Sequence, residues 1–286
     1  MTRLAVVGAG FMGSQIAVQA ALGGVPVRLQ DVAQAQLDRS RELNRGHLAR
    51  RVEKGRMTAE EVEATFSRIS ETTSLEDAVG DADLVIEAIV ENLEAKREVF
   101  ERMDRAAPER TILASNSSTI VISQLASATR RPDRCANMHF FSPVLVMELC
   151  EVVMGPETSE ETAERCMAFV REMGRTPVLV RKEIDGFIVN RILHAATQEA
   201  YRLLDAGVAG FEDIDTAVEK GLNWPMGPFR LGDFTGLDVT YNARRHIYEK
   251  TGDERYRPSD QLREKVERGE LGRKTGRGWY VYEKDK

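Results

Sequence analysis

Gly8-Ala9-Gly10-Phe11-Met12-Gly13 decides the fold of this chain because of the segments on either side of it. The apolar run Leu4–Val7 before it predicts a short strand, and Phe11–Leu22 predicts a helix that follows the strand directly. The stretch therefore reads as the G-x-G-x-x-G turn of a strand–turn–helix unit.

Each glycine of this turn has its own physical role. Gly8 permits a tight bend, Gly10 lets the backbone approach a pyrophosphate, and Gly13 lets the helix and the strand pack closely. The helix starts at Phe11 and Met12, where backbone N–H groups and the helix dipole favour a bound phosphate. The turn predicts a dinucleotide site; the alternative is an ordinary glycine turn.

Asp31 indicates which dinucleotide would bind. It ends the second predicted strand, residues 25–30, and stands 18 positions after Gly13. An acidic residue at that place can bind the ribose 2′-hydroxyl, and its charge would repel a 2′-phosphate. We therefore expect NAD rather than NADP.

The remaining pattern predicts two domains. Strands and helices alternate through the first two thirds, which favours a mostly parallel sheet covered on both faces. After residue 182 the periodicity is helical, so we expect a larger domain at 1–182 and a smaller helical domain at 183–286. The further expected elements are strands at 84–90, 111–115, 147–153 and 177–180, and helices at 33–53, from a capping box at Thr58 onward, and at 159–173.

Composition narrows the class of protein. Of the 286 residues 42% are hydrophobic and 30% charged, as in ordinary soluble proteins, and no run reaches the roughly 18–20 apolar residues of a membrane span. The net charge of -6 argues against general nucleic-acid binding. Cys135, Cys150 and Cys166 are odd in number and lack metal-ligand spacing, which predicts free, largely buried thiols, a reducing cytoplasm and no metal.

A second stretch, Asn137-Met138-His139-Phe140-Phe141-Ser142-Pro143, predicts a proton-transfer site. His139 is placed after the apolar end of a short strand, and Glu151 lies in the next apolar strand. A Pro-bearing connection between the two strands can bring the side chains together, and a carboxylate fixes the imidazole tautomer and favours its charged form. The alternatives are a structural, partly buried histidine and a surface glutamate. With the dinucleotide turn, the pair favours a dehydrogenase over a hydrolase.

Six motifs, in this order along the chain, resemble those of the L-3-hydroxyacyl-CoA dehydrogenase family in its short, two-domain 3-hydroxybutyryl-CoA form. They are Asp83-Leu84-Val85-Ile86-Glu87-Ala88, Leu113-Ala114-Ser115-Asn116-Ser117-Ser118, the His139 stretch, Gly186-Phe187-Ile188-Val189-Asn190-Arg191, Pro225-Met226-Gly227-Pro228-Phe229 and Leu271-Gly272-Arg273-Lys274-Thr275-Gly276. The resemblance covers nearly the whole chain. It implies a Rossmann-type doubly wound first domain, a helical second domain that forms a homodimer, and oxidation of an (S)-3-hydroxyacyl-CoA by NAD.

The resemblance also implies roles for four polar residues. His139 would take the hydroxyl proton, and Glu151 would hold His139 and stabilise its imidazolium. Ser118 and Asn190 would surround the reacting hydroxyl and thioester. For Ser118 the alternative is an N-cap of the following helical segment, and for Asn190 it is a structural hydrogen bond between the domains.

Five further positions match cofactor contacts of the family. Glu91 and Lys96 would lie near the nicotinamide half, and Asn116 would position the nicotinamide or the serine loop. Lys274, in a glycine-rich basic tail, matches another contact, with a solvated lysine as the alternative. Ser142 stands where the family usually has asparagine, so a direct cofactor contact would become water-mediated or be lost, and the substrate range could differ.

Residues 45–56 favour a CoA substrate independently of the resemblance. They contain five cations and one acid, Glu53, a local charge of +4 in an acidic chain. CoA carries a pyrophosphate and a 3′-phosphate, which a basic helix can attract. By resemblance Lys54 is the CoA contact, and His47 is a looser match. The alternative is a solvated helix face.

Two other functions remain open at this stage. One is an NAD-dependent dehydrogenase of the same fold that acts on a free hydroxy acid or a ring alcohol. The other is a non-catalytic NAD-binding protein, which the joint presence of His139, Glu151, Ser118 and Asn190 disfavours.

Overall fold

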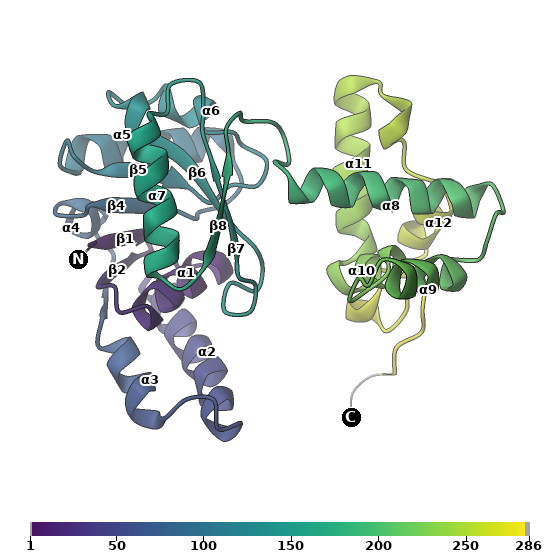
Figure 1. Cartoon of the computed structure of the whole chain (residues 1–286), viewed down its shortest axis with the longest axis horizontal. Helices are drawn as coiled ribbons and strands as arrows, with labels where there is room; N and C mark the ends of the chain where they lie inside the picture. Colours follow the sequence, from purple (N-terminus) through teal and green to yellow (C-terminus); the bar gives the residue numbers. More distant parts are fainter. Residues whose placement is uncertain (1, 284–286) are drawn as a thin grey trace. The chain divides into compact units, whose positions relative to one another are not determined.

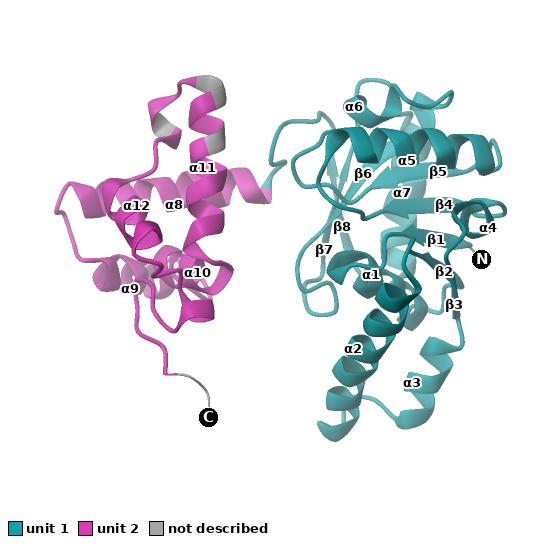
Figure 2. Ribbon diagram, turned by 180° about the vertical axis from the view of Figure 1, so that it is seen from behind, with its two compact units in different colours: residues 1–188 teal, residues 189–286 magenta. Residues whose placement is uncertain are grey.

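The computed structural model describes residues 2–283, apart from the side chains at 246, 250, 251 and 255. It divides into two compact units, residues 1–188 and 189–286 (Figure 2). Residues 183–188 belong to the first unit, where Glu183 Oε2 accepts a hydrogen bond from Ser123 N at 3.1 Å. Within the described residues, no helix is both long and apolar enough to cross a bilayer.

One sheet of eight strands forms the centre of the first unit (Figure 1). Its order is β3-β2-β1-β4-β5-β6-β7-β8, and β1 to β6 all run parallel. β7 runs antiparallel to β6, and β8 is parallel to β7. The strands are β1 Leu4–Val7, β2 Val27–Gln30, β3 Ile69–Thr72, β4 Leu84–Glu87, β5 Ile112–Ser115, β6 Cys135–Phe140, β7 Leu149–Val153 and β8 Thr176–Val180. The order of the first six is that of a Rossmann sheet.

Helices cover both faces of this sheet, which confirms the doubly wound fold predicted from the sequence. Alternate strand residues such as Val6 and Ala5 point to opposite faces, and each face has its own apolar core. α1 and α7 pack on the Val6 face, and α4, α5 and α6 pack on the Ala5 face. The helices of this unit are α1 Phe11–Leu22, α2 Gln34–Glu53, α3 Ala59–Phe66, α4 Leu75–Val79, α5 Leu93–Ala106, α6 Ser123–Ala126, the 3₁₀ turn Pro132–Arg134 and α7 Glu160–Glu172.

Several predicted elements have the bounds expected, and others differ. β1 and α1 match their predicted ranges, and Thr58 forms the predicted capping box with Glu61. The strand predicted at 84–90 ends at Glu87, because the N–H of Ile89 turns back to the Glu87 carboxylate at 2.7 Å. His139 lies inside β6 and not after it. β3 and α4 were not predicted.

The second unit is helical, as predicted. Its core is aromatic: the rings of Tyr201, Phe229 and Trp279 lie 4.8–5.8 Å apart between centroids. The glycine-rich tail is mostly loop with one 3₁₀ turn, and the buried Asp233 holds it by accepting from Trp279 N at 2.9 Å. The elements are α8 Val189–Asp205, α9 Phe211–Gly221, α10 Pro228–Thr235, α11 Leu237–Thr251, the 3₁₀ turns Glu254–Tyr256 and Arg273–Thr275, and α12 Asp260–Glu267.

Candidate active site

The glycine turn has the geometry that its sequence requires. Gly8 has a φ of +102°, and a Cβ there would lie 2.7 Å from Ala88 O. A Cβ on Gly13 would lie 1.9 Å from Gly8 O, so helix and strand could not pack as they do. Around Gly10, the N-cap of α1, in contrast, no described atom lies within 4 Å of such a Cβ. The open backbone and the helix N-terminus fit a dinucleotide pyrophosphate.

Asp31 lies at the carboxyl end of β2, beside this turn. Its Oδ2 accepts from Ala9 N at 2.9 Å, and its Oδ1 accepts from Ala33 N at 3.1 Å. The carboxylate therefore joins the glycine turn to the start of α2. It brings a negative charge to the place expected for the ribose.

The His139–Glu151 pair forms as predicted. The two residues are direct partners across β6 and β7, so their side chains share one face of the sheet. Nδ1 of His139 lies 2.8 Å from Oε2 of Glu151, and both residues are buried. The rings of Phe141 and Phe187 pack on the imidazole with centroids at 4.6 and 5.4 Å. The carboxylate thus engages one ring nitrogen and leaves Nε2 for another partner.

Phe187 and Ile188 complete this pair and were not singled out by sequence reasoning. Phe187 is buried and has a φ of +49°, which is uncommon for a residue other than glycine. The next N–H, that of Ile188, donates to Glu151 Oε1 at 3.0 Å. The apolar Phe-Ile pair after Gly186 was the available signal, but periodicity could not reveal the left-handed backbone.

Asn116 and Ser118, in the loop after β5, differ in their hydrogen bonding. Asn116 Oδ1 accepts from Phe140 N at 3.0 Å, which ties this loop to the residue beside His139. Ser118 is half-buried, and its hydroxyl makes no hydrogen bond with the described residues. The capping alternative for Ser118 is wrong, because Ser117 Oγ accepts the hydrogen bond from Ile120 N at 2.8 Å.

Glu91 and Lys96 belong to a polar cluster at the carboxyl ends of β4 and β5. Lys96 Nζ lies 3.3 Å from Glu91 Oε2 and 2.5 Å from Glu87 Oε1. Burial acts to raise the pKa of Glu91, but hydrogen bonds from Ser117 and Thr119 and the charge of Lys96 outweigh it and hold the pKa below its usual range. Glu87 is fully buried and was missed as a site residue, since it reads as part of an apolar strand.

The basic segment of α2 is only partly free for a ligand. Arg45 pairs with Glu63 at 2.5 Å, and Arg51 Nη2 donates to the carbonyl of Leu145 at 2.5 Å. His47 and Lys54 are exposed. Ser142, in the connection between β6 and β7, is exposed as well.

Asn190 and Lys274 belong to the second unit. Asn190 lies in the first turn of α8. Lys274 Nζ pairs with Asp238 Oδ1 at 2.6 Å, and this hydrogen bond lowers the pKa of Asp238. Lys274 of the basic tail thus forms an ion pair with an acidic residue of its own unit.

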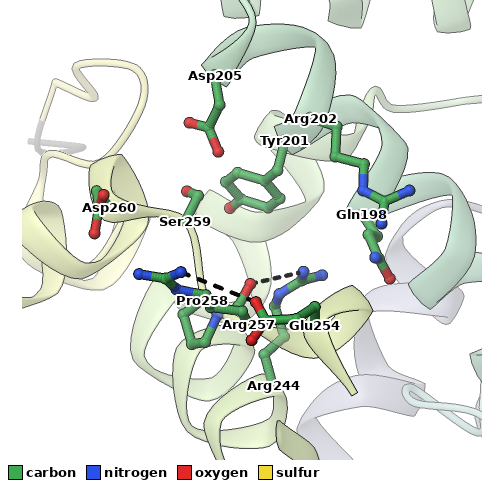
Figure 3. A pocket seen from close by; sticks show the side chains of 10 residues that line it. All are labelled: Gln198, Tyr201, Arg202, Asp205, Arg244, Glu254, Arg257, Pro258, Ser259 and Asp260. Atoms are coloured by element: carbon green, nitrogen blue, oxygen red, sulfur yellow. Dashed lines mark hydrogen bonds and ion pairs between the residues drawn. The ribbon is translucent and has the colours of Figure 1, made fainter. Parts of the chain in front are cut away.

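A hollow of about 280 Å³ opens in the second unit, and none of the predicted site residues lines it (Figure 3). Its lining mixes charges of both signs, and Arg244 Nη2 donates there to Arg257 O at 3.3 Å. The lining residues are Gln198, Tyr201, Arg202, Asp205, Arg244, Glu254, Arg257, Pro258, Ser259 and Asp260.

Comparison with known proteins shows the family of this chain. Residues 3–184 match the family model "3-hydroxyacyl-CoA dehydrogenase, NAD binding domain", and residues 186–282 match "3-hydroxyacyl-CoA dehydrogenase, C-terminal domain". The chain is 45% identical over 281 residues to "Probable 3-hydroxybutyryl-CoA dehydrogenase" of Bacillus subtilis (strain 168), with 98% of this chain and 97% of that protein covered.

Solved structures agree in fold and sequence. The (S)-3-hydroxybutyryl-CoA dehydrogenase PaaH1 from Ralstonia eutropha has a TM-score of 0.92 at 39% identity, covering 99% of this chain and 100% of that one. A diketoreductase, described as acting on dicarbonyl compounds, has a TM-score of 0.88 at 34% identity and covers 99% of both chains. The chain therefore belongs to the 3-hydroxyacyl-CoA dehydrogenase family, an oxidoreductase family with an NAD-binding first domain.

Proposed function

We propose that the protein oxidises the 3-hydroxyl group of a short (S)-3-hydroxyacyl-CoA, with 3-hydroxybutyryl-CoA as the main substrate, to the 3-ketoacyl-CoA. The observation that carries this proposal is the buried contact of 2.8 Å between His139 Nδ1 and Glu151 Oε2. The names of the relatives support the substrate class.

His139 acts as the base in this proposal. Oxidation of a secondary alcohol removes a proton from oxygen and a hydride from carbon. With Nδ1 engaged by Glu151, the neutral imidazole keeps its acceptor at Nε2, where it takes the hydroxyl proton. The charge that then develops on the ring is stabilised by the carboxylate at 2.8 Å. Ile188 N and the phenyl rings of Phe141 and Phe187 keep the pair in this orientation.

NAD supplies the hydride acceptor when it is bound. The residues proposed to hold it are the glycine turn with Phe11 and Met12 for the pyrophosphate and Asp31 for the ribose. The remaining proposed contacts are Glu91, Lys96, Asn116, Ser118, Ser142 and Lys274. Glu91 suits a polar contact because its lowered pKa keeps it ionised at neutral pH.

Ser118 and Asn190 are the residues proposed to contact the reacting end of the thioester substrate. Ser118 offers an uncommitted hydroxyl near the carboxyl edge of β5, and Asn190 offers an amide from α8. His47 on α2 and Lys54 at its C-cap would receive the CoA phosphates. A homodimer through the C-terminal domain and a cytoplasmic location complete the proposal.

A second candidate keeps the fold and NAD but replaces the CoA ester with a compound that lacks CoA. The similarity to a diketoreductase favours it, at 34% identity over 99% of the chain. Ser142 also departs from the family's asparagine, which leaves the substrate range open to change.

Initial rates of NADH or NADPH formation decide between the two candidates. The panel contains (S)-3-hydroxyacyl-CoAs from four to sixteen carbons, free 3-hydroxybutyrate and a cyclic diol, each with NAD and with NADP. We expect the highest kcat/KM for 3-hydroxybutyryl-CoA with NAD. Turnover of the free compounds alone would move the assignment to the second candidate.

A further inference from the structure

Three polar side chains form hydrogen bonds with the backbone of the connection between β6 and β7, residues 141–148. Two consecutive residues of the connection, Val144 and Leu145, are buried, whereas Val146 and Met147 after them are exposed. His139 lies just before the connection and Glu151 just after it. The connection therefore joins the strand that carries His139 directly to the strand that carries Glu151, and its position is linked to theirs.

Side chains from three elements bind the backbone of Val144 and Leu145. Gln15 of α1 accepts from Leu145 N at 3.3 Å. Arg175, just before β8, donates to Val144 O at 2.9 Å. Arg51 of α2 donates to Leu145 O at 2.5 Å. The apolar side chain of Leu145 also packs in a cluster with Leu48 of α2.

Arg51 and Arg175 bind the carbonyls of two consecutive residues, Leu145 and Val144. Burial lowers the pKa of Arg175, and the charge of Arg51 lowers it further. Placing two guanidinium groups together is unfavourable unless each is well bound. Gln19 Oε1 accepts from Arg175 Nη2 at 2.6 Å, Gly174 O accepts from Arg175 Nη1 at 3.3 Å, and the carbonyls of Val144 and Leu145 accept from Arg175 and Arg51. This arrangement is more specific than a solvated basic helix face requires.

Arg51 lies close in sequence to the proposed CoA contacts. His47 and Arg51 are spaced i and i+4, which places them on one side of α2, and Lys54 is the C-cap residue that directly follows the helix. His47 and Lys54 are exposed, whereas Arg51 is half-buried and turned to the connection. The C-terminal half of α2 and its C-cap therefore carry both the proposed phosphate contacts and the bond to the β6–β7 connection.

We propose that Arg51 is a positioning residue that ties the CoA-receiving C-terminal half of α2 to the β6–β7 connection, so that the CoA handle and the His139–Glu151 pair keep a fixed spacing. This inference rests on the proposed function. It assigns Arg51 no direct contact with the phosphates. Remote binding energy of the nucleotide then raises the rate of the chemical step, as expected when a handle orients the reacting group.

The test compares 3-hydroxybutyryl-CoA with the 3-hydroxybutyryl thioester of N-acetylcysteamine, which lacks the nucleotide. The rate of NADH formation in a single turnover is measured for wild type, Arg51→Met and the control Arg50→Met. Arg50 is an exposed cation next to Arg51, so the control removes the same charge without the bond to Leu145. Calorimetry with free CoA measures binding separately, and Arg51→Gln replaces Arg51→Met if the latter does not fold.

We expect the wild type to react faster with the CoA ester, and Arg51→Met to reduce that advantage about ten-fold or more. Arg50→Met should keep it, and both variants should bind free CoA with similar affinity. Equal slowing of both thioesters by Arg51→Met would indicate a general structural role and overturn the inference. An unchanged rate with weaker CoA binding would make Arg51 a simple phosphate contact and also overturn it. A wild type inactive on both thioesters would instead refute the proposed function itself.

Discussion

Lys96 Nζ lies 2.5 Å from Oε1 of Glu87, and the two side chains are only 1% and 0% exposed. The carboxylate also accepts from Ser115 Oγ at 2.7 Å and from Ile89 N at 2.7 Å. Glu87 thus joins the loop that carries Glu91 to the end of β5. This buried pair supports both loops at the proposed cofactor edge.

Removing one partner of this pair should destabilise the protein strongly. Lys96→Met leaves the Glu87 charge buried without its cation, and we expect a loss of about 3–5 kcal/mol in the free energy of unfolding. The double variant Glu87→Gln/Lys96→Met should recover much of that loss. Denaturant unfolding at pH 7 measures both. The exposed pair Glu101–Arg105 on α5 serves as control, where Arg105→Gln should cost less than about 1 kcal/mol. A loss as small as that of the control would refute the expectation.

The His139–Glu151 pair should carry most of the chemical rate. We expect His139→Ala and Glu151→Gln to lower kcat by roughly 10²–10⁴-fold, because the base or its orienting carboxylate is lost. NADH binding, followed by fluorescence, should change little. Glu160→Gln, at an exposed ion pair with Arg181, is the matched carboxylate control. Normal turnover in both pair variants would remove them from the mechanism.

Asp31 should set the choice between NAD and NADP. Asp31→Asn keeps an acceptor for the Ala9 N–H but removes the charge that repels a 2′-phosphate. We expect the ratio of kcat/KM for NAD over NADP to fall about ten-fold or more. Asp38→Asn, an exposed acid on α2, should leave the ratio unchanged. If Asp31→Asn leaves it unchanged too, the preference has another source.

Lys54 should contribute to substrate binding without affecting the chemical step. We expect Lys54→Met to raise KM for the CoA ester roughly ten-fold with kcat within about twofold. The effect should shrink at high salt, because an exposed charge is screened. Arg39→Met, at the exposed start of the same helix, is the control. An unchanged KM would show that CoA does not bind at Lys54.

The three cysteines should be unreactive in the folded protein. All are free and buried, and burial raises the pKa of Cys135 and of Cys166 to about 12 and that of Cys150 well above its usual range. At pH 8 the thiolate is then scarce, so alkylation by iodoacetamide should be roughly a hundredfold slower than after unfolding. Mass spectrometry counts the modified thiols. Rapid modification of the native protein would contradict the burial.

Much of the first unit could be predicted because the local sequence pattern favours the same strands and helices that the fold contains. The glycine turn and the apolar runs around it required β1 and α1, and the structure has both with the predicted bounds. β3 escaped prediction because Ile69-Ser70-Glu71-Thr72 is a half-polar edge strand without an apolar run. Its pairing with β2 depends on tertiary contacts rather than on its own composition.

The contact between His139 and Glu151 could be predicted from the sequence, but the residues that hold this pair and the neighbouring loops in place could not. The spacing of His139 and Glu151 on neighbouring strands suggested their contact. The left-handed backbone of Phe187, the buried carboxylate of Glu87 and the bond from Arg51 to Leu145 all depend on segments that meet only in the folded chain. A single sequence carries no local signal for such meetings.

The antiparallel pairing of β6 and β7 has a consequence for how this enzyme family can diversify. Because His139 and Glu151 face each other in the strand ladder, backbone hydrogen bonds set their separation, and the length of the intervening segment does not. The exposed tip at Val146 and Met147 can therefore change in length or composition while the contact between His139 and Glu151 stays intact. Insertions and substitutions at this tip are the sequence changes that the pair tolerates most readily.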